Sequence, residues 1–142
     1  MKKDRAELLK YGHVNPDFKR TIYVSHSTGY DFKNELYAPI RNSRLNRKYN
    51  LILPHEKSDE LFSSKEFIKY ETWAMIVEAS YPKLGVGIEA GLAHAFDKDI
   101  ITMYKKGFKQ SASINSISEK IIEYSSIDEM VFKLLFALRE IC

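Results

Sequence analysis

Residues 73–91 read Trp-Ala-Met-Ile-Val-Glu-Ala-Ser-Tyr-Pro-Lys-Leu-Gly-Val-Gly-Ile-Glu-Ala-Gly, and this stretch decides the fold. Its first part, residues 73–79, is a nearly continuous apolar run, which is typical of a strand buried on both faces. A polar loop follows, and two glycines one residue apart then open a small-residue helix over residues 86–96. The order strand, loop, helix predicts one unit of a parallel sheet.

Similar apolar runs alternate with helical patterns along the rest of the chain. We expect strands over residues 21–24, 49–53, 100–104 and 121–124, and helices over residues 4–11, 31–46, 64–70 and 128–139. Pro39 should kink or split the second of these helices. The alternation predicts an α/β fold of the flavodoxin-like or Rossmann-like three-layer type, with a five-stranded parallel sheet in order 2-1-3-4-5 and helices on both faces. We expect residues 1–142 to form one domain, in which residues 1–19 are an N-terminal extension.

The composition excludes several classes of protein. The chain has 142 residues, with 22 Lys and Arg against 19 Asp and Glu, and a net charge of +3 is too mild for a nucleic-acid binder. One cysteine allows no intramolecular disulfide and no Cys-rich zinc site, and the four histidines share no metal-ligand spacing, so we expect no metal. No apolar run approaches the roughly 18 residues of a membrane helix. With no targeting segment evident, we expect a cytoplasmic protein without a membrane partner.

The predicted topology places the loops after the first and third strands opposite each other, at the carboxyl ends of the strands. These loops are residues 25–29 and 80–87. In the second loop, Gly85 and Gly87 would let the backbone approach a ligand, and a helix N-terminus attracts anions such as phosphate. The spacing G-x-G-x-x-x-G after a third strand differs from the dinucleotide fingerprint, and no P-loop motif is present, so no cofactor is expected.

Two carboxylates each keep two interpretations. Glu89, expected in the first turn of the helix after the glycines, is either a surface group that stabilises the helix dipole or a carboxylate ready to act as a nucleophile. Glu78 ends an apolar strand, where it is either a buried, hydrogen-bonded carboxylate near the site or an edge-facing strand terminus.

Together these segments resemble the nucleoside 2-deoxyribosyltransferase-like superfamily, and most closely its 2′-deoxynucleoside 5′-phosphate N-hydrolases. The resemblance is specific in the motif Pro82-x-Leu84-Gly85-Val86-Gly87-x-Glu89-x-Gly91. It is looser elsewhere between residues 21 and 113, where Tyr23 and Ser27 match the first loop of the family. Residues 1–19 have no counterpart.

The resemblance implies roles for particular residues. Glu89 would attack the sugar C1′ and form a glycosyl-enzyme, with Tyr23 close to the nucleophile and the sugar. Ser27 and Ser113 would bind the 5′-phosphate, Ser113 from the neighbouring subunit of a homodimer. We add His26, Gly85 and Gly87 to the candidate substrate-binding or phosphate-binding residues.

Two positions depart from the family pattern. Lys83 stands where the family has a serine after the proline, and a lysine can hold a phosphate as a point charge. The family aspartate before strand three aligns with Lys65, and the nearest carboxylate is Glu66. A glycoside cleavage normally needs a second acid for the leaving group, so Glu66, His26 and His55 are the candidates for that role.

The sequence thus favours an N-glycosidase that acts on a (deoxy)nucleoside 5′-monophosphate and releases the free base. A nucleoside 2-deoxyribosyltransferase would follow if a second base, rather than water, accepted the sugar. An NAD glycohydrolase resembling Toll/interleukin-receptor domains is suggested by residues 22–27, although the segment 84–87 does not suit that family. A non-catalytic nucleotide-binding module is the third reading, and the missing aspartate is its main support. The identity of the base and of the sugar stays open.

Overall fold

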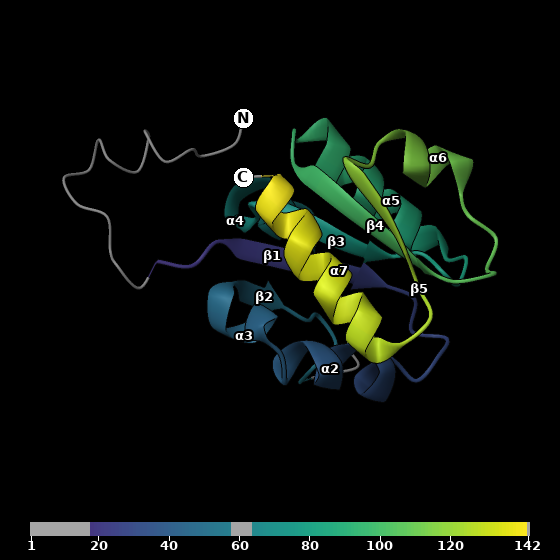
Figure 1. The fold of residues 1–142 in the computed structure, drawn as a ribbon. Coiled ribbons are helices and arrows are strands. Elements are labelled where there is room, and N and C mark those ends of the chain that lie inside the picture. The colour runs from purple at the N-terminus through teal and green to yellow at the C-terminus, as the bar shows by residue number, and fades with distance from the viewer. Residues whose placement is uncertain (1–17, 58–63, 142) are drawn as a thin grey trace.

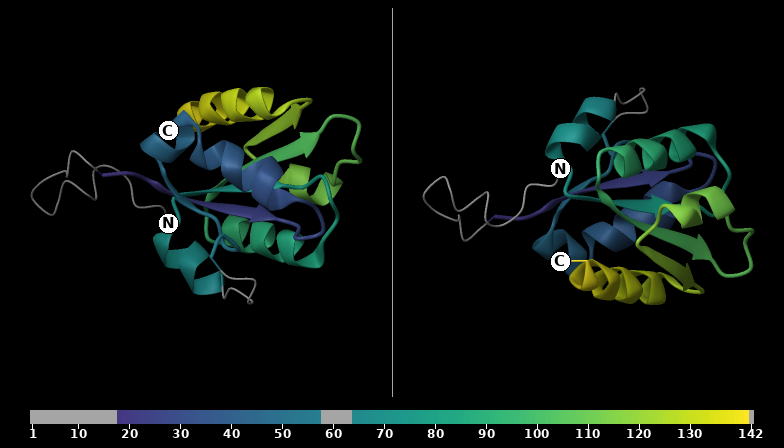
Figure 2. Two further views of the ribbon diagram at one scale, coloured as in Figure 1. Left: turned by 90° about the horizontal axis from the view of Figure 1, so that it is seen from below. Right: turned by 90° about the horizontal axis from the view of Figure 1, so that it is seen from above.

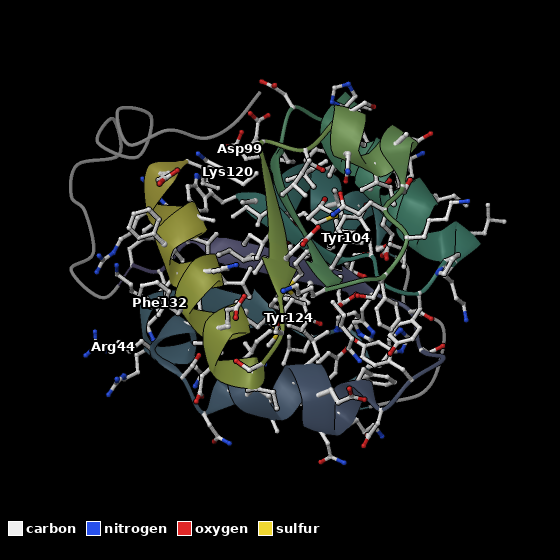
Figure 3. The ribbon with its side chains drawn as sticks, turned by 45° about the vertical axis from the view of Figure 1, so that its right-hand side comes forward. Arg44, Asp99, Tyr104, Lys120, Tyr124 and Phe132 are labelled. Atoms are coloured by element: carbon white, nitrogen blue, oxygen red, sulfur yellow. The ribbon has the colours of Figure 1, made fainter. Side chains whose placement is uncertain are left out.

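Five strands form one parallel sheet in the order β2-β1-β3-β4-β5 (Figure 1). The computed structural model describes residues 18–57 and 64–141. The strands are β1 (Thr21–His26), β2 (Asn50–Ile52), β3 (Ala74–Glu78), β4 (Asp99–Lys105) and β5 (Lys120–Tyr124). All neighbouring pairs are parallel, which confirms the predicted fold class and strand order. Figure 3 shows the common direction in β4 and β5: Asp99 and Lys120 lie toward one end, and Tyr104 and Tyr124 toward the other.

Helices cover both faces of the sheet, as the edge-on views of Figure 2 show. One face carries α4 (Lys65–Glu71), α5 (Leu84–Ala95) and α6 (Ala112–Ser116). The other carries the π-helix η1 (Lys33–Tyr37), α2 (Ala38–Arg41), α3 (Arg44–Lys48) and α7 (Ile127–Glu140). β3 is buried along its whole length because a central strand of a parallel sheet is covered on both sides.

Side-chain alternation assigns each strand residue to one of the two faces. Tyr23 and Val77 pack in the apolar cluster beneath α5, whereas Val24 and Ile76 pack in the cluster beneath α7. The alternation therefore places Ser25 on the α5 face, with Tyr23, and places the last residues of β1 and β3 on the α7 face. The two candidate carboxylates consequently lie on opposite sides of the sheet.

Two element boundaries differ from the sequence prediction and change the position of candidate residues. β1 continues through His26 because it pairs with β3 up to Glu78, so residues 25 and 26 belong to the strand and not to the loop. α5 begins at Leu84, two residues before the predicted start, with Lys83 at its N-cap. Glu89 is therefore the sixth residue of α5, in its second turn, and the prediction that it lies in the first turn was wrong.

The segment predicted as one interrupted helix over residues 31–46 folds as three short pieces. Pro39 occupies the second position of α2, where a missing N–H is tolerated. The predicted loop before β5 contains α6, which is capped by Ser111: its hydroxyl accepts a hydrogen bond from the N–H of Ile114 at 3.1 Å. The helix expected over residues 4–11 lies outside the described residues. Within the described ranges, no helix has the length and apolar character needed to cross a bilayer.

Candidate active site

The carboxylate of Glu89 lies against two hydroxyl groups of the interior strand β1. Tyr23 donates its hydroxyl to Oε2 of Glu89 at 2.6 Å, and Ser25 donates to Oε1 at 2.9 Å. Both donors point to the α5 face because they are two residues apart on a strand. Glu89 is half-buried, so each of its oxygens has a partner while part of the side chain stays exposed.

The phenol of Tyr23 keeps its proton in this setting. Burial raises its pKa well above the ordinary value, and the charge of Glu89 and the hydrogen bond to it raise that pKa further. The side chain of Ser64, just before α4, has the opposite and smaller effect on the same pKa. Tyr23 is therefore suited to donating a hydrogen bond to Glu89 and not to giving a proton to a leaving group.

The loops that follow β1 and β3 contact each other, as the predicted topology requires. Nζ of Lys83 donates to Oγ1 of Thr28 at 3.2 Å, and both side chains are exposed. Ser27 is buried, and its hydroxyl accepts a hydrogen bond from the N–H of Gly29 at 3.0 Å. The structure thus brings Lys83 to the loop that carries Ser27. Both residues were predicted to bind phosphate.

Packing against residues 18–57 and 64–141 does not require the glycines of α5. A Cβ built at Gly85, Gly87 or Gly91 meets no atom within 4 Å, apart from its own neighbours and helix backbone. A glycine in a helix interior costs roughly 0.5–1 kcal/mol relative to alanine. Three such residues in one helix lower its intrinsic stability, and the described residues show no close packing that requires them.

A hollow of about 850 Å³ lies between α5 and α6. Its walls include Lys83, Gly87 and Ser113, which were predicted to bind phosphate, but not Glu89 or Tyr23. The walls are largely apolar and carry no carboxylate. The hollow is therefore separate from the Glu89 carboxylate, which contacts Tyr23 and Ser25 of β1.

His26 lies on the other face of the sheet from Glu89. Nδ1 is 2.8 Å from the carbonyl oxygen of Ser27, so this nitrogen must carry the proton, since a carbonyl only accepts. Nε2 then accepts a hydrogen bond from the hydroxyl of Tyr37 at 2.6 Å, and that hydroxyl accepts one from the N–H of His55 at 3.0 Å. Burial lowers the pKa of the His26 imidazole. The neutral His26 ring, with a hydrogen bond at each nitrogen, therefore fixes the loop after β1 from the α7 face of the sheet.

The other candidates for the leaving-group acid are not joined to Glu89. Glu66 is exposed on α4. His55 is half-buried on the α7 face, where its ring lies 5.7 Å from that of His26. Among the described residues, no hydrogen bond or ion pair connects Glu66 or His55 to Glu89, whose side-chain partners are Tyr23 and Ser25.

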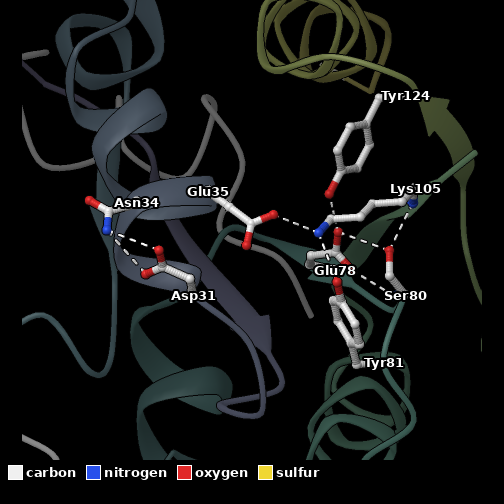
Figure 4. A network of polar contacts seen from close by, with 8 residues as sticks. All are labelled: Asp31, Asn34, Glu35, Glu78, Ser80, Tyr81, Lys105 and Tyr124. Carbon is white, nitrogen blue, oxygen red and sulfur yellow. Dashed lines mark hydrogen bonds and ion pairs between the residues drawn. The ribbon is translucent and has the colours of Figure 1, made fainter.

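Glu78 is a buried, hydrogen-bonded carboxylate, the first of the two interpretations left open by the sequence. Its Oε1 accepts from the N–H of Ser80 at 2.6 Å, and its Oε2 accepts from the hydroxyls of Ser80, at 3.1 Å, and Tyr124 (Figure 4). The hydroxyl of Ser80 accepts in turn from the N–H of Lys105 at 2.8 Å. These bonds fix Ser80 near the start of the loop that leads into α5.

Sequence reasoning missed Ser25 and Ser64. For Ser25 a signal was present, because a residue two positions after Tyr23 on the same strand shares its face. For Ser64 the signal was its position beside Lys65, where the family pattern has its aspartate. Neither type of residue is distinctive enough to be singled out without the fold.

Comparisons with known proteins agree on the fold. No protein-family model matches the chain, and no curated protein matches its sequence. Among solved structures, the CMP N-glycosidase BcmB of Clostridium botulinum matches with a TM-score of 0.58 and 18% identity, over 81% of this chain and 98% of that one. A conserved protein from Enterococcus faecalis V583 matches with a TM-score of 0.61 and 15% identity, over 84% of this chain and 99% of that one. At these identities, the chain shares with both proteins the arrangement of its sheet and helices.

Proposed function

We propose that this protein is an N-glycosidase that cleaves a (deoxy)nucleoside 5′-monophosphate through a covalent intermediate on Glu89. One observation carries the proposal: Glu89 is the only carboxylate of α5, and both its oxygens accept hydrogen bonds from hydroxyls of β1, near the carboxyl end of that strand. The fold shared with a CMP N-glycosidase and the resemblance of the 82–91 motif support the same chemistry.

The proposed reaction has two steps. In the first, a carboxylate oxygen of Glu89 bonds to the sugar C1′, and the bond from C1′ to the base nitrogen breaks with its electron pair going to the base, which takes up a proton. In the second, water bonds to C1′ and loses a proton to solvent, while the C1′–oxygen bond returns its electron pair to Glu89. The products are the free base and a sugar 5-phosphate.

The remaining parts of the site fit the phosphate end of this substrate. The Lys83 ammonium supplies a charge, and the exposed Thr28 hydroxyl, on the loop that also carries Ser27, lies 3.2 Å from it. Glu66 and His55 are the remaining candidates for the proton of the leaving base, because His26 uses both ring nitrogens and Tyr23 retains its proton. A second base in place of water would make the same intermediate a deoxyribosyl donor.

A panel of nucleosides and their 5′-monophosphates, in ribose and deoxyribose forms, tests the proposal by chromatography of the released base. Wild-type protein should release base from at least one monophosphate, and Glu89→Gln should lose most of this activity because an amide does not attack C1′. Glu71→Gln, at an exposed carboxylate of α4, is the matched control and should resemble wild type. Base release by Glu89→Gln within tenfold of wild type would refute the assignment of Glu89 as the nucleophile.

The same panel separates the alternatives. Transfer of the sugar to an added free base identifies a transferase, and release of nicotinamide from NAD identifies an NAD glycohydrolase. A monophosphate that binds tightly and is recovered intact after long incubation identifies a binding module.

A further inference from the structure

The second hydrogen bond to Glu89 comes from Ser25, to which the sequence analysis gave a place in the loop after the first strand but no role of its own. The Ser25 side chain is fully buried, with 0% of its surface exposed. Its hydroxyl donates to Oε1 of Glu89 at 2.9 Å. A buried hydroxyl without a partner is costly, so this contact is integral to the packing between β1 and α5.

Ser25 is held more rigidly than the carboxylate that it contacts. β1 lies between β2 and β3, and Ser25 pairs with Val77 in the parallel ladder. A glutamate carboxylate on its own has a broad range of rotation about its last bond. With Tyr23 on Oε2 and Ser25 on Oε1, both donated from one strand, the plane of the Glu89 carboxylate is set by the sheet.

We propose that Ser25 is a positioning residue for Glu89 that orients the carboxylate for attack and stabilises it as the leaving group of the second step. This inference rests on the proposed N-glycosidase function. During the first step, the carboxylate gives up charge to the new bond with C1′. During the second step, the C1′–oxygen bond breaks and the full negative charge returns to the carboxylate, where a donated hydrogen bond lowers its energy.

The two steps therefore respond differently to the loss of Ser25. A carboxylate with one donor fewer is a poorer leaving group, so breakdown of the glycosyl-enzyme slows more than its formation. The base leaves when the glycosyl-enzyme forms, and the glycosyl-enzyme then accumulates because its breakdown is slow. The expected kinetic signature is therefore a burst of free base followed by slow turnover. A hydrogen bond to a charged group corresponds to roughly ten- to hundredfold in rate.

The test compares wild type, Ser25→Ala and Ser25→Thr on the monophosphate that the wild type cleaves. Ser25→Ala should show steady-state turnover about ten- to hundredfold slower, a burst of base approaching one equivalent, and the mass of the glycosyl adduct in the intact-protein spectrum. Ser25→Thr retains a hydroxyl and suits a strand, so it should recover turnover and lose the adduct.

A control for general damage to the sheet is Thr102→Val. Thr102 is a fully buried strand hydroxyl whose partner is Oγ of Ser118 at 2.6 Å, away from Glu89. This variant should show no burst and no adduct, whatever its melting temperature.

If Ser25→Ala folds, turns over at the wild-type rate and carries no adduct, the role of Ser25 is refuted while the N-glycosidase function stands. If Ser25→Ala does not fold, Ser25→Cys takes its place and must show the burst and adduct. A wild type that releases no base from any monophosphate overturns the proposed function and this inference with it.

Discussion

Nζ of Lys105 and Oε1 of Glu35 are 2.7 Å apart, although the two residues are 70 positions apart in the sequence. This ion pair joins the end of β4 to the π-helix η1. The same ammonium donates to the hydroxyl of Tyr81 at 2.8 Å (Figure 4). It also lies 5.1 Å from the ring centroid of Tyr30, and the Tyr30 ring stacks on that of Tyr81 with centroids 4.6 Å apart. Lys105 therefore connects the segments after β1 and β3, the two that carry the candidate phosphate-binding residues.

Replacing Lys105 by methionine should destabilise the protein by about 1–2 kcal/mol. The substitution keeps the apolar stem but removes the ion pair, the bond to Tyr81 and the cation–π contacts, and the partial exposure of the pair keeps each contribution small. Urea unfolding measures the change as a lower midpoint at constant m-value. Lys106→Met, at the adjacent exposed lysine, is the control, and equal midpoints for the two variants would contradict the prediction.

His26 predicts a loss of stability in mildly acidic solution. Burial lowers the pKa of its imidazole below the ordinary value of 6.5, and the hydrogen bond to the Ser27 carbonyl only partly offsets this. Below pH 6.5 the unfolded chain therefore binds a proton that the folded chain does not. His26 therefore does not lower the free energy of unfolding above pH 6.5. Below that pH the free energy of unfolding falls, until the pH reaches the folded-state pKa of His26.

The measurement is urea unfolding of wild type, His26→Asn and the exposed His94→Asn between pH 7.5 and 5. Wild type and His94→Asn should lose stability over this range, and His26→Asn should lose less. The ion pair of Glu56 does not interfere, because Arg41 holds the pKa of Glu56 below its ordinary value of 4.5 and that loss begins at lower pH. If the free energy of unfolding depends on pH equally in all three proteins, His26 is not the source of the acid sensitivity.

The sheet could be predicted from sequence because each strand is a short apolar run between polar loops. Residues 73–79, for example, were predicted as a strand, and β3 occupies Ala74–Glu78. The opposition of the loops after β1 and β3 followed from topology alone. The start of α5 did not follow, because its N-cap, Lys83, makes no side-chain capping bond and so has no signature in the sequence.

The polar contacts of the site depend on the face to which each residue points and on partners far along the chain. The sequence prediction placed His26 in a loop and grouped it with Ser27, whereas two further ladder pairs extend β1 through His26 and its ring lies on the α7 face. Glu35, Lys105 and Tyr124 carried no motif, and their meeting around the loop before α5 is a property of the tertiary fold (Figure 4). Periodicity indicates which side chains are buried, but not which polar groups will meet.

The exposed apolar residues of α5 predict self-association. Leu84 and Ile88 line the hollow between α5 and α6 and keep 82% and 55% of their surface exposed. Ser113 lines the same hollow. We expect a homodimer that covers this face, since contiguous apolar surface of this kind marks interaction sites.

Sedimentation at micromolar concentration checks the state of wild type and of Leu84→Glu/Ile88→Glu. Two carboxylates in an apolar interface would be buried without partners, so the double variant should be a monomer. Phe132→Glu, at an exposed phenylalanine of α7 on the opposite side of the sheet, should sediment as wild type does. A monomeric wild type would contradict the prediction and the participation of Ser113 of a neighbouring subunit.

Lys83 should set the preference for a monophosphate over a nucleoside. Its ammonium lies 3.2 Å from the Thr28 hydroxyl, at the N-cap of α5, where free N–H groups already favour an anion. A charge-assisted contact to phosphate contributes about 1.5–3 kcal/mol, or roughly ten- to hundredfold in affinity. Lys83→Ala should therefore weaken monophosphate binding by that factor, with a smaller difference at high salt, and leave nucleoside binding nearly unchanged.

Calorimetry in the Glu89→Gln background measures this without turnover, using one nucleoside and its 5′-monophosphate as a matched pair. Lys106→Ala serves as control for the loss of one positive charge elsewhere on the surface, and it should leave both affinities near the parent values. A selective loss for the monophosphate would assign the phosphate to the loop between Pro82 and Leu84, because the two ligands differ in that group alone. Equal losses for both ligands would mean that Lys83 acts through the shape of the loop. No loss for either would mean that the ammonium points to solvent, and the preference for monophosphates would then rest on Ser27 and the backbone of α5.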